Sequence, residues 1–510
     1  MRGRLTGLAA ATALLAASAP SGATPVSYER PCADWGMYGG GLARTFSRPC
    51  PSAITRESVV LLVQAWAVKT PKTVTASPVV AGGRVFVGAW DGVMRAYDAA
   101  DGTLRWSFQT AAADGAAFGP IVSSGAVARV EGRDLLYFGA GPVLYALDAR
   151  TGRRVWSRAY NRSLPVATTP VEIESSPAVY GGVVYVGLNT HNRPASETGG
   201  EPGALLAVDA RTGRDRWRFE PDPRGKGCGG VWGSPAIDVK RHRVVFGTAN
   251  CNVVSDWTPF TEAVIALDAR TGKPVWSYRP SSPNVRDEDF GATPNLFTDA
   301  HGIDVVGIGK KDARYYVVRA ADGRLLRSTK VAEPGDVQDG FAIGGFIGST
   351  AVVGGKVFGG TAIGGPPYFH SIDGTTGAIR WRGVSAPVYA ASAAVPGVAF
   401  NAALDGVLKA FDSETGLLLW AAPLLGPSSS GPAVVGDMVF VGSGTSSSDA
   451  CAKGVPGSNE CMSAFDTVLG STGGVQAFRL LPLGLSLQSG RSAGSPSRTG
   501  SPLPRSSPRE

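Results

Sequence analysis

Charge is scarce in this sequence, and after its first residues it has no long apolar run. Only 18% of the 510 residues are Asp, Glu, Lys or Arg. The formal net charge is +8, but the arginines form neither a stripe nor a patch interleaved with aromatic residues, so we expect no nucleic-acid partner. No later run approaches the ~20 apolar residues that cross a bilayer, so we expect no transmembrane segment.

The one short apolar run lies at the start of the chain. Arg2 and Arg4 precede an uncharged stretch from Leu8 to Ala17, which is the pattern of a secretory signal. Small residues favour cleavage near Ala23, with Ala19 as an alternative. We therefore expect a signal peptide over residues 1–23 and a protein that is secreted or otherwise extracytoplasmic, in a periplasm or cell-wall space.

Cysteine is also sparse, and its arrangement excludes two features. The chain has six cysteines, none in a Cys-X-X-Cys-His motif, so no c-type haem is attached. No cysteine lies close behind the signal to carry a lipid anchor. In an exported chain an even count favours disulfides over free thiols.

Glycine is abundant, with 69 residues, and the sequence contains an internal repeat. A short β-branched and aromatic run ends in Gly, a variable loop follows, and then come an apolar-Ala-apolar-Asp stretch, Thr-Gly or Asp-Gly, and Trp. One clear copy runs from Val184-Tyr185-Val186-Gly187 to Gly213 and Trp217. Arg327 replaces tryptophan in one copy. The positions counted are Trp66, Trp106, Trp156, Trp217, Trp276, Arg327, Trp381 and Trp420.

These units predict an all-β, eight-bladed propeller of four-stranded blades over residues 63–480. The last repeat, from Val439, lacks an outer strand, and Val63–Ala67 precedes the first full repeat. We expect this N-terminal strand to complete the last blade, with residues 24–62 packed on the propeller. The Ser-, Pro- and Arg-rich tail, residues 481–510, is expected to be disordered.

Strand order places the long loops and the links between blades on one face, which we call the long-loop face. Its loops span Leu188–Gly203, Asn250–Glu262 and Ser443–Gly473, and such loops concentrate binding residues. The positions of the cysteines along the chain predict three disulfides: Cys32-Cys50, Cys228-Cys251 and Cys451-Cys461.

The fourth repeat and the link after it hold an unusual set of residues. Val231-Trp232-Gly233-Ser234-Pro235 is followed by a Gly-X-X-Asn stretch ending at Asn250, and then by Asp287-Glu288-Asp289-Phe290-Gly291. This arrangement resembles the quinoprotein alcohol dehydrogenases, eight-bladed propellers that bind pyrroloquinoline quinone (PQQ) and Ca²⁺. The resemblance extends from Trp35 to about Phe478.

The resemblance implies a role for each residue. Trp232 would stack on the quinone and Lys311 would contact its oxygens. Asn250 would bind calcium with a glutamate of the third-blade loop, Glu197 or alternatively Glu201. Asp289, or alternatively Asp287, would be the base that takes the alcohol proton. The chain departs from many members of the family in having no adjacent Cys-Cys pair.

Two stretches, Trp35-Gly36-Met37-Tyr38 and Val74-Thr75-Ala76-Ser77-Pro78, resemble the polyvinyl-alcohol dehydrogenase branch, without its cytochrome c part. They suggest a bulky or polymeric alcohol as substrate and a separate electron acceptor. The alternative is a non-catalytic propeller that binds proteins or assists envelope assembly, since fold alone does not define function.

Overall fold

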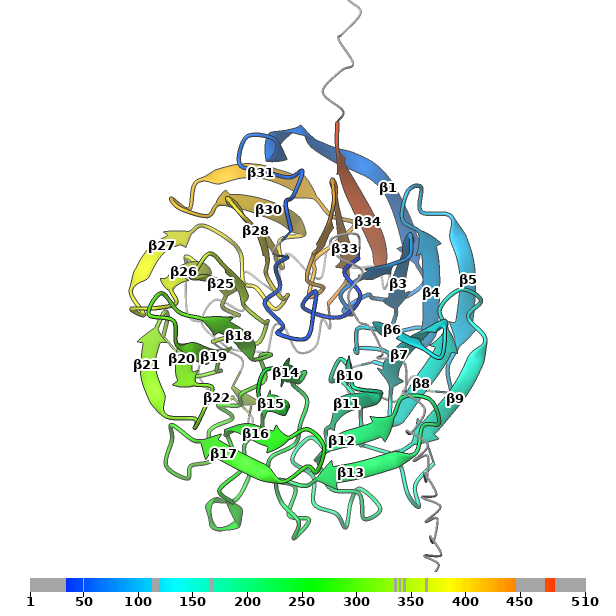
Figure 1. Cartoon of the computed structure of the whole chain (residues 1–510), viewed down its shortest axis with the longest axis vertical. Helices are drawn as coiled ribbons and strands as arrows, with labels where there is room; N and C mark the ends of the chain where they lie inside the picture. Colours follow the sequence, from blue (N-terminus) through cyan, green and yellow to red (C-terminus); the bar gives the residue numbers. More distant parts are fainter. Residues whose placement is uncertain are drawn as a thin grey trace, which may run out of the picture.

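The computed structural model describes residues 34–48, 50–111, 119–165, 169–333, 337–338, 341–342, 345–362, 366–445 and 473–481. Eight four-stranded sheets surround a central axis, which confirms the predicted eight-bladed propeller (Figure 1). In the described part of the chain no helix has the length and apolarity needed to span a membrane. The expected signal peptide, Cys32, Cys451, Cys461 and residues 482–510 lie outside the described residues.

The first four blades are each built from four consecutive strands. Blade 1 contains β2 (Val79–Ala81), β3 (Arg84–Gly88), β4 (Val93–Asp98) and β5 (Leu104–Gln109). Blade 2 contains β6 (Ala126–Val130), β7 (Arg133–Ala140), β8 (Val143–Asp148) and β9 (Arg154–Ala159). Blade 3 contains β10 (Ala178–Tyr180), β11 (Val183–Leu188), β12 (Ala204–Asp209) and β13 (Asp215–Phe219). Blade 4 contains β14 (Ala236–Asp238), β15 (Arg243–Gly247), β16 (Val264–Asp268) and β17 (Pro274–Tyr278).

The next three blades follow the same order. Blade 5 contains β18 (Asn295–Thr298), β19 (Asp304–Gly309), β20 (Arg314–Arg319) and β21 (Leu325–Lys330). Blade 6 contains β24 (Ala351–Val353), β25 (Lys356–Gly360), β26 (Phe369–Asp373) and β27 (Ile379–Gly383). Blade 7 contains β28 (Ala393–Val395), β29 (Val398–Ala402), β30 (Val407–Asp412) and β31 (Leu418–Pro423). Outside the blades lie η1 (Val59–Leu61), η2 (Val254–Asp256) and a small hairpin of β22 (Val337–Gln338) and β23 (Phe341–Ala342).

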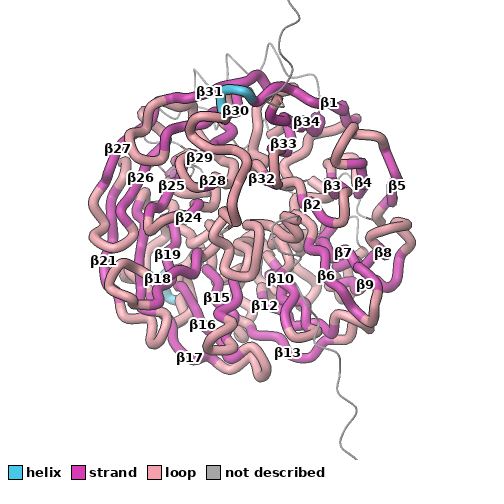
Figure 2. Tube along the Cα trace, turned by 45° about the horizontal axis from the view of Figure 1, so that its top comes forward, coloured by secondary structure: helices cyan, strands magenta, loops and turns pink. Residues whose placement is uncertain are grey.

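Blade 8 joins the two ends of the chain, as predicted. Its strands β32 (Ala433–Val435), β33 (Met438–Ser443) and β34 (Gly473–Leu480) are completed by β1 (Leu62–Thr70), in the order β1-β34-β33-β32. Trp66 lies opposite Ala477 in this antiparallel pair. In Figures 1 and 2, β1 takes its place on the circumference with the outer strands of the other blades. Without β1, the outer edge of β34 would be left unpaired.

The repeated tryptophans connect each blade to the next. Seven indole N–H groups donate to a backbone carbonyl of the following blade at 3.0–3.1 Å, from Trp66, Trp106, Trp156, Trp217, Trp276, Trp381 and Trp420. Arg327 occupies the eighth position and donates from Nε and Nη2 to the Gly374 carbonyl at 3.0 and 2.6 Å. Its guanidinium also pairs with Asp299 at 3.1 Å. The degenerate copy thus keeps the hydrogen bond that its indole would have made.

The glycine of the Thr-Gly turn receives the tryptophan of the preceding blade. Gly213 has φ +72°, and a Cβ built on it would lie 2.7 Å from Trp156 Cε3. Any larger residue would be strained and would displace the ring. The Gly and Trp of the repeat therefore meet across the seam between blades, which accounts for their joint recurrence.

A chain of hydroxyl groups links the blades nearer the axis. In the links between blades, Ser77 N donates to Ser124 Oγ, Ser124 N to Ser176 Oγ, and Ser176 N to Ser234 Oγ, at 2.8–3.0 Å. These serines are buried, so the hydroxyls satisfy amide groups that have no strand partner. The bonds fix the links that carry the candidate site.

The N-terminal segment, residues 34–48, crosses the centre of the ring (Figure 1). Its backbone is hydrogen-bonded to the first strands of six blades, through Val80, Val127, Ile237, Leu296, Val352 and Ala394. The fully buried Arg44 donates to the carbonyls of Pro235, Ser176 and Pro177 at 2.8–3.1 Å and also to that of Tyr38. The segment thus holds the inner strands of the ring together at its centre.

Candidate functional site

The predicted residues of blades 4 and 5 meet on the long-loop face. Trp232 lies in the link before β14, and Asn250 follows β15. Asp287 and Asp289 lie in the link before β18, and Lys311 follows β19. Because links and second-strand ends share this face, the topology brings together residues that are far apart in sequence.

Asp289 is the centre of the group. Its Oδ2 accepts hydrogen bonds from Trp232 Nε1 at 3.0 Å and Lys311 Nζ at 3.1 Å. Its Oδ1 accepts one from the Asn250 backbone N–H at 2.7 Å. The carboxylate is only 4% exposed, so these donors take the place of water. The structure thus brings the indole, a carboxylate and the ammonium named from the sequence into hydrogen-bonding contact.

Lys311 bridges the two aspartates. Its Nζ lies 2.9 Å from Asp287 Oδ2 and 3.1 Å from Asp289 Oδ2. Burial alone would lower the pKa of Lys311, but the Asp289 and Asp287 carboxylates raise it above its ordinary value. Burial, and next the Asp289 carboxylate, together raise the pKa of Asp287 to about 7 against the opposing effect of Lys311. The site thus contains a fixed cation and a carboxyl group that titrates near neutrality.

Trp232 is partly exposed and rests against a glycine. A Cβ on Gly291 would lie 1.7 Å from Trp232 Cη2, so only glycine leaves room for the indole. Lys311 Nζ lies 5.3 Å from the ring centroid, within the range of a cation–π contact. These contacts fix the indole beside the carboxylates.

Asn250 lies in a cluster of amide oxygens. Its side chain is buried, and its Oδ1 accepts a hydrogen bond from Asn192 Nδ2. The buried Oδ1 of Asn192 has no hydrogen-bond partner in the described part of the chain. Amide oxygens are ligands for a hard cation such as Ca²⁺, so this orphaned atom fits a cation beside Asn250.

The two glutamates considered as calcium ligands have other contacts. Glu201 is buried and pairs with Arg162 at 2.8 Å and with Arg218 at 2.6 Å. Glu197 is 55% exposed and lies 3.6 Å from Arg193. Glu201 is already neutralised by two guanidinium groups, whereas Glu197 is held only by an exposed pair.

The cysteines of this region confirm one predicted disulfide. Cys228 and Cys251 are bonded, and they tie the link before blade 4 to the loop that follows Asn250. Cys50 is also disulfide-bonded, but its partner lies outside the described residues. The expected Cys451-Cys461 pair lies outside them as well.

Sequence reasoning missed a buried charge cluster behind the site. Lys310 is fully buried, and its Nζ lies 3.3–3.4 Å from carboxylate oxygens of Glu262, Glu288 and Asp312. Burial raises the pKa of Glu262 to about 8, although Lys310 opposes the shift. The two adjacent lysines thus pair with different carboxylates: Lys311 with those of the candidate site, and Lys310 with those of the buried cluster. The Lys310-Lys311-Asp312 sequence did not reveal which lysine is buried.

It also missed Glu172, Glu174 and His191, whose ligating atoms lie within 4.8 Å of one another. For Glu174, the repeat contained a signal that could have identified the residue. Glu174-Ser175-Ser176-Pro177 precedes β10 as Trp232-Gly233-Ser234-Pro235 precedes β14. Glu174 therefore has in blade 3 the position that Trp232 has in blade 4.

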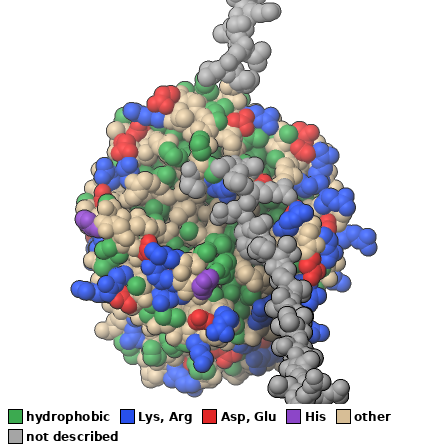
Figure 3. All heavy atoms as spheres, in the orientation of Figure 1, with side chains coloured by type: hydrophobic (Ala, Val, Ile, Leu, Met, Phe, Trp, Pro, Cys, Tyr) green, Lys and Arg blue, Asp and Glu red, His purple; other side chains and the backbone are tan. Residues whose placement is uncertain are grey.

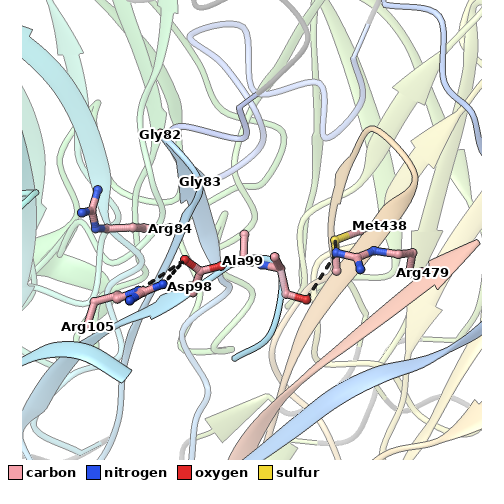
Figure 4. A pocket seen from close by; sticks show the side chains of 9 residues that line it. Gly82, Gly83, Arg84, Asp98, Ala99, Arg105, Met438 and Arg479 are labelled. Atoms are coloured by element: carbon pink, nitrogen blue, oxygen red, sulfur yellow. Dashed lines mark hydrogen bonds and ion pairs between the residues drawn. The ribbon is translucent and has the colours of Figure 1, made fainter. Parts of the chain in front are cut away.

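A separate cavity of about 480 Å³ lies at the seam between blades 8 and 1. In Figure 4, Arg105 is paired with Asp98 and Arg479 reaches the Ala100 carbonyl, at 2.7 and 3.3 Å. None of the candidate site residues lines it. On the face seen in Figure 3, positive and negative side chains are mixed around the rim, so the net charge is not gathered there into one patch.

The fold and this arrangement define a propeller of the dehydrogenase type. Residues 35–336 match the family model described as the β-propeller domain of glucose, ethanol and alcohol dehydrogenases, and the chain belongs to this family. The resemblance seen in the sequence is thereby confirmed. Residues 311–454 also match a model described as outer membrane protein assembly factor BamB.

Individual relatives agree with the family. The chain is 26% identical over 483 residues to a polyvinylalcohol dehydrogenase of Pseudomonas sp., covering 80% of this chain and 73% of the relative. It is 28% identical over 374 residues to quinohemoprotein alcohol dehydrogenase ADH-IIG of Pseudomonas putida, covering 62% and 49%. The solved structure of quinohemoprotein alcohol dehydrogenase ADHIIG from Pseudomonas putida HK5 matches with TM-score 0.72 and 20% identity, covering 92% of this chain and 83% of that one. That structural likeness supports the fold.

Proposed function

We propose that this chain is an exported quinoprotein dehydrogenase that oxidises an alcohol with PQQ and Ca²⁺ and passes the electrons to a separate acceptor. The observation that carries the proposal is the contact of one buried carboxylate, Asp289, with Trp232, Lys311 and the Asn250 backbone. A packing role alone gives no reason for an indole, a carboxylate and an ammonium to be assembled on the face of the long loops.

The residues present fit the two groups that the family implies. Trp232 offers a partly exposed aromatic ring to a planar quinone, and Lys311 offers a positive charge to its oxygens. Asn250, and the unpartnered oxygen of Asn192, suit a hard cation. Of the expected glutamates, Glu197 is the one whose carboxylate is held only by an exposed ion pair; Glu201 is the alternative. When bound, PQQ supplies the two-electron acceptor of the alcohol oxidation.

The chain itself supplies proton transfer and orientation. We assign the alcohol proton to Asp289, because three hydrogen bonds hold this carboxylate in one orientation. Asp287 shares Lys311 with it, and the pKa of Asp287, raised by burial to about 7, makes it the alternative proton acceptor. The Lys311 charge stabilises negative charge developing beside either carboxylate.

The test is reconstitution of the purified protein with PQQ and Ca²⁺. Binding is measured by calorimetry, and dye reduction is measured with primary, secondary and polymeric alcohols. Trp232→Ala should abolish PQQ binding, whereas Trp232→Phe should retain most of it. Asp289→Asn should bind PQQ but lower kcat by about 100-fold or more, and Asp405→Asn, at a surface pair with Lys409, should change neither.

The relatives named above make bulky or polymeric alcohols the first substrates to test. The alternative function, a protein-binding or envelope-assembly scaffold, is favoured by the match of residues 311–454 to the assembly-factor model. Failure of the wild-type protein to bind PQQ in the presence of Ca²⁺ would reject the dehydrogenase and leave that alternative.

A further inference from the structure

Three ligating side chains converge on the long-loop face of blade 3. Glu172 and Glu174 come from the link before β10, and His191 comes from the loop after β11. His191 Nε2 lies 3.4 Å from Glu172 Oε2 and 3.3 Å from Glu174 Oε1. All three are at least largely buried, which sets them apart from ordinary surface carboxylates.

The backbone around these side chains is fixed by its own hydrogen bonds. Glu172 and Asn189 exchange two backbone bonds, at 3.0 and 2.8 Å. The Asn189 side-chain oxygen accepts the N–H groups of Thr190 and His191, and its Nδ2 donates to Glu174 Oε1 at 2.9 Å. Asn189 Nδ2 also lies 3.4 Å from His191 Nδ1. One asparagine thus orients two of the three ligating residues, as groups around metal ligands commonly do.

The spacing of the donor atoms fits a small cation. Two ligand atoms each 2.0–2.1 Å from a tetrahedral ion are about 3.3–3.4 Å apart. The two distances from His191 Nε2 have these values. The three donors would leave a fourth position to water.

Charge and unsatisfied polar atoms agree with a cation here. Two carboxyl groups are largely buried beside one imidazole, with oxygens 3.3 and 3.4 Å from its Nε2. A dication would offset this unfavourable burial. Ser175 follows Glu174, and Thr190 precedes His191; both hydroxyls are buried and lack a hydrogen-bond partner among the described residues. Water bound to a cation could supply such partners.

We propose that Glu172, Glu174 and His191 form a binding site for a divalent transition metal of the Zn²⁺ class. An imidazole with two carboxylates favours such an ion over Ca²⁺, which prefers oxygen ligands alone. The three donors are different residues from Asn250 and Asp289 but lie beside that group, because Asn192, the residue after His191, donates to Asn250 Oδ1. Metal binding is measured without PQQ and without dehydrogenase activity, so failure of this proposal can be distinguished from failure of the proposed function. Bound metal would hold the link before blade 3 to the loop that also carries Asn192.

A rival explanation is that protonated His191 serves only as the counter-charge of the two carboxylates. Burial would lower the pKa of His191, but Glu174 and Glu172 raise it above its usual value. This rival accounts for the same distances and predicts that no metal binds. A direct measurement of metal binding distinguishes the metal site from this rival.

The experiment uses the whole purified protein, stripped with a chelator and free of PQQ. Co²⁺ is titrated first, because its visible absorption reports ligand type and geometry, and Zn²⁺ displacement then gives the affinity. We expect one site per chain, with Zn²⁺ bound in the presence of a large excess of Ca²⁺. His191→Gln and Glu174→Gln should each weaken Zn²⁺ binding at least about 10-fold.

His242→Gln is the matched control. His242 lies in the short turn between β14 and β15, on the face opposite the long loops, where it contacts Tyr180 through Nδ1; its variant should bind Zn²⁺ as the wild type does. Thermal unfolding of each variant checks that it is folded, and Glu174→Gln, which retains the side-chain volume, serves if His191→Gln is unstable. No Co²⁺ absorption band, displacement of Zn²⁺ by Ca²⁺, or unchanged Zn²⁺ affinity in both folded variants would overturn the proposal.

Discussion

Single residues in this protein matter most where burial and charge coincide. Lys310 and Lys311 are neighbours in sequence, yet one neutralises an internal carboxylate cluster and the other holds the two aspartates of the site. The carboxyl groups around the two lysines differ in how many hydrogen-bond donors they have. Asp289 accepts hydrogen bonds from Trp232, Lys311 and the Asn250 backbone, whereas the buried Glu262 faces the Lys310 ammonium at 3.4 Å and shares it with Glu288 and Asp312.

Glu262 should make stability depend on pH. Its pKa is raised by burial to about 8, so between about pH 4.5 and 8 the folded protein holds a proton that the unfolded chain has lost. The free energy of unfolding should therefore fall as pH rises through this window and level off above it. Glu262→Gln should remove part of that fall, of the order of 1–3 kcal/mol.

Urea unfolding of the wild type and the variant at several pH values measures this effect. Glu131→Gln is the control, because Glu131 has a similar backbone conformation, φ 47° against 46°, but is exposed. Parallel pH profiles for wild type and Glu262→Gln would show that Glu262 is ionised in the folded protein.

The elements of the fold depend on contacts between neighbouring blades. Each of the seven indoles donates to a carbonyl of the next blade, and for all of them except Trp420 the glycine of that blade's Thr-Gly or Asp-Gly turn receives the ring. Arg327 demonstrates that the hydrogen bond is the shared requirement, because a guanidinium meets it without an aromatic ring.

Gly213→Ala should destabilise the protein by about 2–4 kcal/mol, because the new Cβ would be strained at φ +72° and would meet the Trp156 ring. Gly83→Ala separates the two causes. Gly83 has φ +74° but nothing within 4 Å of a new Cβ, so this variant should lose only about 1 kcal/mol. Denaturant midpoints provide the comparison, and equal losses would mean that the indole contact contributes nothing.

The repeat was enough to predict the elements, but the site was only partly predictable. The spacing of Gly and Trp gave the number of blades, and the unfinished repeat after Val439 indicated the closing strand. Trp232, Asn250, Asp289 and Lys311 were found because a resemblance assigned them roles. The repeat marked the position of Glu174, which is equivalent to that of Trp232, but not its contact with His191, because His191 lies in a long loop whose shape no periodic pattern determines.

At the scale of the whole molecule, the N-terminal segment links six blades through its backbone, including blades on opposite sides of the ring. Arg44 adds side-chain bonds to this, because its guanidinium donates to carbonyls at the start of blades 3 and 4 and in the segment itself. Asn295 Nδ2, from blade 5, donates to the Arg44 carbonyl at 2.6 Å. Buried carbonyls without donors are costly, so the side chain stabilises several blades at once.

Arg44→Met keeps most of the side-chain volume and removes every donor. We expect the free energy of unfolding to fall by about 2–5 kcal/mol, with the transition remaining cooperative. Arg48→Met is the control, because Arg48 is partly exposed, whereas Arg44 is fully buried; Arg48 donates to the Gly40 carbonyl at 2.8 Å. Calorimetry of both variants measures the difference. A similar small loss in each would contradict a special role for the buried guanidinium.

The pairing of β1 with β34 sets the order in which the molecule can be completed. β1 is synthesised before any complete blade, yet among the described strands its one partner is β34, the last strand of the ring. Until Leu480 has left the ribosome and, for an exported chain, crossed the membrane, the first strand has no neighbour. All eight blades must therefore be synthesised before the ring can close. A chain truncated before β34 would leave β1 and β33 with unpaired edges that could pair with other molecules.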